Sequence, residues 1–442
     1  MKTIDTLIHA RWIIPVEPAD TVLENYAIAV HDGKILDMLP SHQAQQHYQA
    51  GNIYQLLEHV LIPGLINTHT HAAMSLFRGL ADDLPLMDWL QNHIWPAEGR
   101  WVNPEFVHDG TQLAIAEMIR SGTTCFNDMY FCPDVTARVA DSVGMRATVG
   151  MIIIDFPTVW ANNADEYIHK GIEVHDYYRN NSLIHTTFAP HAPYTVSDAP
   201  LERIVTLAEE LDIPIHMHVH ETAFEVYDAE QKGKRPLQRL QEIGLVSPRL
   251  MAVHMTQLNE ADIEMMATAG AHVVHCPESN LKLASGYCPV QSLLNAGINV
   301  ALGTDGAASN NDLDMLGEMR SAALLAKTVA NDASAVPAMK ALEMATLNGA
   351  RALGLDDSIG SLVQGKAADM VAINMSDIAT QPLYHPVSQL VYAATRQQVS
   401  HVWVAGNPLL KDGALTTLDT DAIIAKAKQW AIKIQQTDEH PE

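Results

Sequence analysis

Six short apolar segments of the chain end in histidine or acidic side chains, the residue types that bind metals and transfer protons. The residues at these ends are His69 and His71, His191, His216 to Glu221, His254, His275 and Asp305. If the segments are neighbouring strands of one sheet, their ends meet at one edge. The sequence therefore predicts a metal site surrounded by groups that can act as acids and bases.

His69 and His71 form the most informative pair. Side chains two residues apart on a strand point to the same side, roughly 6–7 Å apart, so two imidazoles can hold one ion. A His-x-His pair can also be the solvated end of a strand. The apolar residues before His69, and the histidines and aspartate on other segments, favour the metal site.

The fifth segment offers three histidines of equal parity, His216, His218 and His220, and spacing alone does not choose the ligand. His216 lies deeper and is equally suited to a hydrogen-bonded core. Glu221 has the opposite parity, but the end of a strand can turn it inward, where a carboxylate beside a metal suits acid-base catalysis. Glu221 is also compatible with a position at a helix N-terminus.

Asp305 follows the apolar run Ile298–Leu302, and a charge in such a place needs a partner, either a metal ion or a protonated imidazole. His254 is suited to the site or to the core. Three histidines and one aspartate suit zinc, iron or manganese, and such an ion activates water near neutral pH. The chain has no glycine-rich nucleotide loop and no serine nucleophile elbow.

The elements that must position these residues are eight short apolar runs that alternate with amphipathic stretches. Strands of this kind are covered on both faces by helices, and eight such units predict a (β/α)8 TIM barrel with its chemistry at the C-terminal strand ends. The runs are Leu61–Thr68, Thr123–Met129, Ala147–Ile154, Ile184–Pro190, Ile213–His220, Leu250–Met255, Ala271–Cys276 and Ile298–Thr304.

Strand patterns at both chain ends predict a small β unit that is discontinuous in sequence. The predicted strands are Thr6–Ile14, Ala27–His31, Lys34–Met38, Gln55–Val60, Met370–Asn374 and Val399–Val404. The predicted division is residues 1–60 and 365–442 for this unit and residues 61–364 for the barrel. Helices are expected over Leu313–Thr328, Val336–Leu353 and Thr420–Gln435, and the first two offer a face for a second copy of the chain.

Composition narrows the range of partners. The 442 residues carry 27 basic and 52 acidic side chains, a net charge of −25, which disfavours nucleic acid and anionic membranes. Four unpatterned cysteines suggest no disulfide framework, and we find no signal segment or apolar run of membrane-spanning length. A cytoplasmic enzyme for small molecules is expected.

The segments Pro63–His71 and Gly365–Val371 make the chain similar to the amidohydrolase superfamily along nearly its whole length. This resemblance implies a (β/α)8 barrel with a β-sandwich built from both chain ends. Within the superfamily the chain resembles deaminases of 5′-methylthioadenosine and S-adenosylhomocysteine. The similar segments are His71–Gly79, Trp89–Leu90, Ala189–Tyr194, His275–Asn280 and Thr304–Asn311.

The resemblance implies a set of roles for residues of this chain. One zinc ion per subunit is expected on His69, His71, His218 and Asp305. The implied reaction is attack of water on C6 of the adenine ring and loss of ammonia, which gives the inosine analogue. Glu221 is expected to protonate the ring nitrogen, and Asp305, with His254, is expected to take the proton of the water.

The resemblance also implies a nucleoside-binding role for Trp89, Glu98, His191 and Glu221, with Glu98 on the ribose hydroxyls. Arg146 is expected to bind a substrate carboxylate. Adenosine itself is a further candidate substrate. Two alternatives stay open: a chlorotriazine or guanine hydrolase on the same scaffold, and a non-catalytic scaffold. The complete ligand set argues against the second alternative, and the sequence does not rank the three adenosines.

Overall fold

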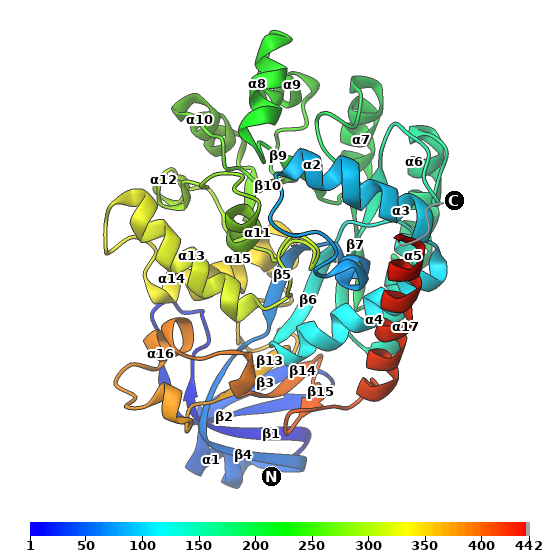
Figure 1. The fold of residues 1–442 in the computed structure, drawn as a ribbon. Coiled ribbons are helices and arrows are strands. Elements are labelled where there is room, and N and C mark those ends of the chain that lie inside the picture. Colours follow the sequence, from blue (N-terminus) through cyan, green and yellow to red (C-terminus); the bar gives the residue numbers. More distant parts are fainter. Residues whose placement is uncertain (439–442) are drawn as a thin grey trace.

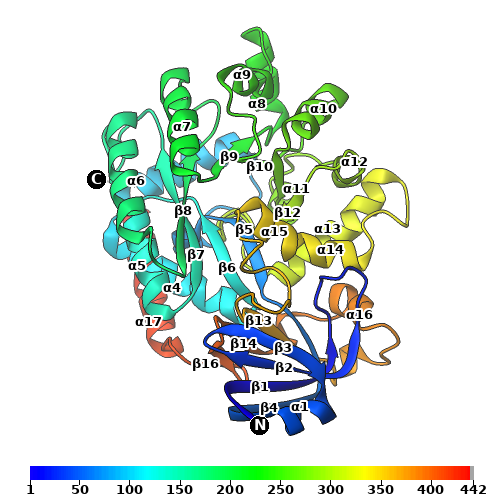
Figure 2. The same ribbon diagram turned by 180° about the vertical axis from the view of Figure 1, so that it is seen from behind.

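Eight parallel strands, arranged in chain order, form the central sheet of the protein. The computed structural model describes residues 1–438, and Figures 1 and 2 show this sheet surrounded by helices. Its strands are β5 (Leu65–Thr70), β6 (Thr123–Asp128), β7 (Arg146–Ile153), β8 (Ile184–Pro190), β9 (Ile215–Val219), β10 (Leu250–His254), β11 (His272–His275) and β12 (Val300–Leu302). Each strand overlaps one of the predicted apolar runs, and the prediction of a (β/α)8 barrel is confirmed.

The seam between β12 and β5 closes the barrel through side chains as well as backbone. The side-chain amide of Asn67 donates to Thr304 Oγ1 at 2.7 Å, and its Oδ1 accepts the N–H of Thr304 at 3.0 Å. The N–H of Asp305 donates to the carbonyl of His69 at 3.0 Å. A Cβ on Gly303 would lie 2.8 Å from the backbone nitrogen of His69, so glycine permits this close approach.

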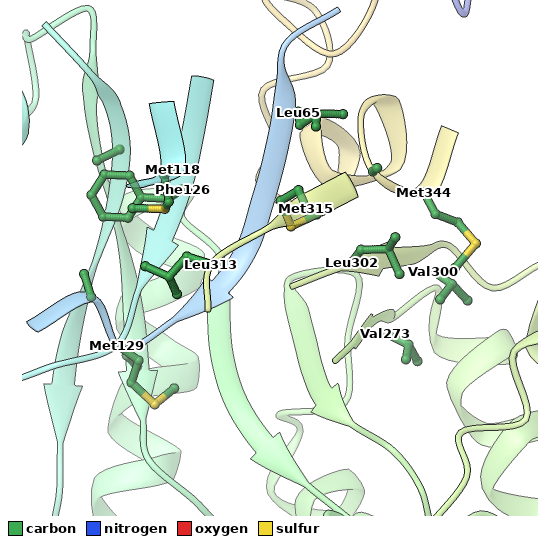
Figure 3. Close-up of a cluster of buried hydrophobic side chains, with 14 of the residues drawn as sticks. Leu65, Met118, Phe126, Met129, Val273, Val300, Leu302, Leu313, Met315 and Met344 are labelled. Atoms are coloured by element: carbon green, nitrogen blue, oxygen red, sulfur yellow. The ribbon is translucent and has the colours of Figure 1, made fainter. Parts of the chain in front are cut away.

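Helices cover the outside of the barrel. They are α4 (Pro104–Arg120), α5 (Pro133–Val143), α6 (Ala164–Tyr178), α7 (Asp198–Leu211), α8 (Ala223–Gln231), α9 (Pro236–Ile243), α10 (Glu260–Ala269), α11 (Pro277–Lys282), α12 (Val290–Asn295), α13 (Met315–Ala330), α14 (Ala338–Met344) and α15 (Leu347–Ala352). Figure 3 shows apolar side chains from strands and helices in this layer, among them Phe126, Leu302, Met118 and Met315. Burial of this apolar surface stabilises the barrel.

The predicted helix Val336–Leu353 is wrong as one element, because α14 and α15 are separated at Ala345 and Thr346. The carbonyl of Ala345 accepts the N–H of Ile66 on β5 at 2.9 Å and so bonds to the barrel. Two short helices α2 (Leu86–Trp89) and α3 (Trp95–Trp101) follow β5.

A second eight-stranded sheet combines both ends of the chain, as predicted, and lies at one end of the barrel (Figure 1). Its strands are β1 (Lys2–Ile13), β2 (Leu23–His31), β3 (Lys34–Pro40), β4 (Tyr48–Pro63), β13 (Met370–Asn374), β14 (Val399–Val404), β15 (Asn407–Lys411) and β16 (Ala414–Leu415). β4 joins the two halves, because it pairs in parallel with β1 and antiparallel with β13. The predicted boundary at residue 60 falls inside β4.

Three further helices belong to the chain ends: α1 (Ser41–His47), α16 (Pro386–Tyr392) and α17 (Thr420–Asp438). α17 lies beside α4, where Lys426 and the indole N–H of Trp430 both contact the buried carboxylate of Asp109, at 3.0 and 3.1 Å. No helix within residues 1–438 is both long and apolar enough to cross a membrane.

Candidate metal centre and catalytic pocket

Four side chains at the ends of three barrel strands, β5, β9 and β12, meet at the C-terminal end of the barrel. They are His69, His71, His218 and Asp305, whose possible ligand atoms all lie within 4.8 Å of one another. Asp305 Oδ1 lies 3.2 Å from Nε2 of both His69 and His71, and His218 Nε2 lies 3.2 Å from His69 Nε2. The cluster therefore presents three imidazole nitrogens and one carboxylate oxygen to one point.

The Nδ1 atoms of the three imidazoles, which face away from the cluster, all have hydrogen-bond partners; that of His69 is His216, described below. Nδ1 of His71 lies 2.5 Å from the carbonyl of Met129, and Nδ1 of His218 lies 2.8 Å from the carbonyl of His191. A carbonyl only accepts, so these Nδ1 atoms carry protons, and in the neutral imidazoles the Nε2 atoms offer their lone pairs to a metal. The donor set and its orientation fit a divalent ion such as zinc.

Asp305 is held by groups on both sides of its carboxylate. Its Oδ2 accepts the hydroxyls of Ser279 at 2.6 Å and Ser309 at 2.8 Å, and its Oδ1 accepts the N–H of Gly306 at 2.8 Å. Burial opposes ionisation, but the hydrogen bonds from His69 and His71 hold the pKa of Asp305 well below its ordinary value. The carboxylate is thus ionised before any substrate reacts.

The two histidines of β5 are affected differently by this charge. Burial lowers the pKa of His69 to about 4, so its imidazole is neutral, as a metal ligand must be. Burial also opposes the charging of His71, but the hydrogen bond to Asp305 and the Met129 carbonyl raise its pKa to about 9. A divalent cation and a proton therefore compete for the His71 position.

Glu221 and His254 lie next to the cluster. His254 Nε2 is 3.7 Å from Glu221 Oε1, and His254 Nδ1 is 2.9 Å from the side-chain oxygen of Asn280. Burial raises the pKa of Glu221, with the charge of His254 acting in the opposite direction. A carboxyl group with a raised pKa beside a metal cluster is suited to carry a proton to and from a substrate.

Backbone geometry explains how Glu221 reaches the cavity despite its parity. His220 has a φ of 52°, in the left-handed region, which turns the chain at the end of β9. Glu225 then accepts the N–H groups of His220 at 3.1 Å and Glu221 at 2.8 Å. Glu225 is a residue that the sequence reasoning missed, and the only available signal was a carboxylate four residues after Glu221.

Asn127 and His216 form a second layer behind the cluster. His216 is fully buried, and its Nε2 lies 2.8 Å from Nδ1 of His69. The side-chain amide of Asn127 contacts His216 Nδ1 at 3.1 Å and the carbonyl of Thr68 at 2.9 Å. His216 is therefore a hydrogen-bonded core residue that orients His69. Asn127, Ser279, Ser309 and Asn280 were missed because their roles depend on contacts between distant strands.

A cavity of about 440 Å³ opens over these groups. Its lining includes His71, His218, Asp305, Glu221 and His254 at the barrel end, together with three further residues expected from the sequence: Trp89, Glu98 and His191. Burial raises the pKa of Glu98 to about 7, partly offset by the neighbouring Tyr130 and His71. Burial lowers the pKa of His191 to about 3, so its imidazole is neutral.

Arg146 is the one expected site residue that the structure places elsewhere. It begins β7, at the opposite end of the strand from the cavity, and its guanidinium binds the carboxylate of Asp369 at 2.8 and 3.2 Å. A third contact, at 2.8 Å, goes to the carbonyl of Ser182. The prediction that Arg146 binds a substrate carboxylate is therefore wrong. Its guanidinium is bound by Asp369 and Ser182 at the end of β7 that lies opposite the cavity.

Comparison with known proteins places the chain among metal-dependent hydrolases. Residues 60–409 match the amidohydrolase family. A 5-methylthioadenosine/S-adenosylhomocysteine deaminase of Saccharophagus degradans is 54% identical over 432 residues, which cover 98% of this chain and 97% of the relative. A crystal structure of an adenosine deaminase from Xanthomonas campestris with bound zinc has a TM-score of 0.97 and 55% identity, with 98% of this chain and 99% of that chain covered.

One further solved structure bears on the chlorotriazine alternative. Atrazine chlorohydrolase from Arthrobacter aurescens has a TM-score of 0.90 with coverage of 96% of this chain and 99% of that chain, but only 21% identity. That likeness shows a common fold alone. The extent of the family match and the much higher identity to the deaminases agree with the predicted fold and enzyme class: the chain belongs to the amidohydrolase family.

Proposed function

We propose that this protein is a zinc-dependent deaminase that hydrolyses the 6-amino group of adenosines, among them 5′-methylthioadenosine, S-adenosylhomocysteine and adenosine. The observation that carries the proposal is that Glu221 and three members of the four-residue cluster, His71, His218 and Asp305, line the same cavity as Trp89 and Glu98. That cavity offers proton-transfer groups at one end and nucleoside-binding groups around it. The names of the most similar relatives support the same reaction.

His69, His71, His218 and Asp305 would hold one zinc ion in each subunit. When bound, the ion would supply Lewis acidity that makes water reactive near neutral pH. The hydrogen bonds from His71 to Met129 and from His218 to His191 keep the ligand nitrogens oriented toward that ion. Asp305 keeps its second oxygen on Ser279 and Ser309, so the carboxylate cannot rotate away.

Three residues would move protons in the reaction. Glu221, whose pKa is raised by burial, protonates the ring nitrogen next to C6 and makes that carbon electrophilic. Asp305 accepts the proton of the attacking water, and His254, held by Asn280, orients that water. Asp305 passes its proton to the 6-amino group, the C–N bond breaks and ammonia leaves, and the remaining hydroxyl proton returns to Glu221 as the inosine analogue forms. The fixed charges favour the transition state because they need no rearrangement as the charge develops.

The other end of the cavity would hold the nucleoside. The indole of Trp89 lines the cavity while its N–H donates to the carbonyl of Ala81 at 3.0 Å, which fixes the ring as a flat apolar wall. Glu98 would accept the ribose hydroxyls, and the neutral imidazole of His191 would contact the purine. These assignments extend to this chain the roles that the family resemblance implies.

A substrate panel tests the proposal directly. The zinc-loaded protein is incubated with the three adenosines, guanine and a chlorotriazine, and ammonia, chloride and adenine absorbance are measured. We expect ammonia and loss of adenine absorbance from the adenosines, without chloride from the triazine. Turnover of guanine or the triazine alone would contradict the proposal, and a metal-free protein after careful purification would revive the non-catalytic scaffold.

The remaining expectations belong to the same proposal. We place the enzyme in the cytoplasm with a small-molecule nucleoside substrate, without nucleic acid or membrane partners, and with self-association through the helices after β12 as the arrangement to test. The division into residues 1–60, 61–364 and 365–442 also remains our proposal. Its first boundary lies within β4.

A further inference from the structure

The charged groups of the catalytic cavity are all acidic or histidine. Glu98, Glu221 and Asp305 line it, and none of its lining residues within the described part of the chain is a lysine or an arginine. Arg146, the expected partner of a substrate carboxylate, is bound to Asp369 at the other end of the barrel. A negative group on a substrate would therefore meet like charges here.

One wall of the cavity, made by the end of β7 and by the segments after β6 and β7, is largely apolar. It includes Phe131, Ile152, Ile154, Phe156 and Val159, with Thr158 as its polar member. Glu98, the proposed ribose ligand, comes from α3 and lies beside Tyr130, next to this wall. With C6 of adenine at the metal cluster and the ribose at Glu98, the 5′ substituent would extend past Glu98, where this apolar wall is available to it.

A second cavity of about 620 Å³ adjoins the first and shares Leu86, Tyr194 and Glu221 with it. It contains basic residues, but each already has an acidic partner. The pairs are Lys232 with Asp228 at 2.6 Å, Arg239 with Asp198 at 2.6 Å, and Lys234 with Glu242. Glu221 and Glu225 add further acidic groups to its lining, so this cavity offers no unpaired cation to a substrate carboxylate either.

We propose that this site selects adenosines whose 5′ substituent is neutral and apolar, such as a methylthio group, over those with a 5′ amino acid such as homocysteine. An acidic residue could pair with the ammonium of homocysteine, but its carboxylate would lose water without gaining a cation. A methylthio group instead buries apolar surface against the wall. The inference rests on the proposed function and names its substrate class.

The test compares kcat/KM for three 5′ substituents on the zinc-loaded protein. 5′-methylthioadenosine carries the short neutral group, S-adenosylhomocysteine the charged one, and 5′-butylthioadenosine matches the four-carbon length of homocysteine without its charges. We expect S-adenosylhomocysteine to be at least about tenfold poorer than both neutral thioethers, because its carboxylate would lose water beside acidic groups without gaining a cation.

Each other result of this comparison contradicts a stated part of the inference. A ratio under tenfold between the methylthio and homocysteine compounds overturns the selectivity. A butylthio compound as poor as the homocysteine compound shows that length, not charge, limits the site, and overturns the charge argument. Failure of all three adenosines to react contradicts the proposed function, whereas turnover of all three at equal rates contradicts the inference alone.

A substitution in the apolar wall provides a second test. Phe156 lines the cavity and is 43% exposed, so it can be replaced at little cost to packing. Phe156→Arg should raise kcat/KM for S-adenosylhomocysteine relative to 5′-methylthioadenosine at least about fivefold, because the new cation can pair with the carboxylate. Phe156→Leu, the matched control, should leave that ratio within twofold. An equal ratio in the two variants contradicts the electrostatic explanation.

Discussion

Glu225 accepts the backbone N–H of Glu221, with 2.8 Å between its Oε2 and the amide nitrogen. The second oxygen of Glu225 accepts the N–H of His220, so one buried carboxylate holds the turn that directs Glu221 into the cavity. Because small displacements of a proton-transfer group reduce turnover, Glu225→Gln should lower kcat about ten- to a hundredfold with little change in KM.

The control for this change is Glu264→Gln, which alters an exposed carboxylate on α10. Both variants should bind one equivalent of zinc and give the same thermal midpoint within a few degrees. Steady-state kinetics and metal analysis check the result. An unchanged kcat in Glu225→Gln would show that the turn holds Glu221 without this carboxylate.

Substitution of Glu221 should have the largest effect on kcat. Glu221→Gln keeps the size of the side chain but removes the transferable proton, so kcat should fall by roughly 10²–10⁴-fold. Its zinc content should be unchanged, since Glu221 is outside the four-residue cluster. Retention of most activity in this variant would remove Glu221 from the mechanism.

Loss of the cluster should be visible as loss of metal. Asp305→Ala removes the only carboxylate of the cluster within the described residues, and it should lower the zinc content, abolish turnover, or both. Dialysis of the unaltered protein against a chelator should abolish activity, and added zinc should restore it. Full metal content together with normal turnover in Asp305→Ala would exclude the assigned role.

The affinity for the nucleoside should depend on pH through Glu98. Its pKa is raised by burial to about 7, so the group is ionised above that pH and protonated below it. The ionised form accepts both ribose hydroxyls, so KM for adenosine should rise as the pH falls from about 8 to 6. In Glu98→Gln the KM should be high and nearly constant over this range, and a parallel pH profile in both proteins would contradict the assignment.

Arg146 should matter for stability and not for substrate binding. Arg146→Met leaves the buried carboxylate of Asp369 without its cation, which costs roughly 3–5 kcal/mol for a pair of this type. Denaturant unfolding should show the loss, while KM for the adenosines stays unchanged in the fraction that is folded. A raised KM with normal stability would restore the role in substrate binding.

The barrel could be predicted because each of its strands is covered on both faces. Runs such as Ile298–Thr304 are largely apolar, and the fully apolar strand β12 (Val300–Leu302) lies within that run. The ends of the helices were harder to predict from the sequence. The break between α14 and α15 depends on Ala345 bonding to Ile66, a contact between residues far apart in sequence, which local periodicity does not encode.

Most of the predicted site residues lie at strand ends, and eight of the ten line the cavity. Parity placed His69 and His71 together, but it could not distinguish His216 from His218, because the difference lies in depth along β9. The prediction that Arg146 binds a substrate carboxylate was wrong because it rested on a local sequence match, with no pattern that placed the residue at the cavity end of its strand. The start of β7 and its end point to opposite ends of the barrel, which residue type alone does not reveal.

The pairing of β4 with β13 has a consequence for the order of synthesis. β1 to β4 leave the ribosome first, but the antiparallel partner of Val60 to Pro63 is Met370–Ile373, which is made after the entire barrel. The edge of β4 therefore stays open while the barrel is translated, and open strand edges invite pairing with other chains. Truncated or stalled chains of this protein should be prone to aggregate until residues 370–374 emerge.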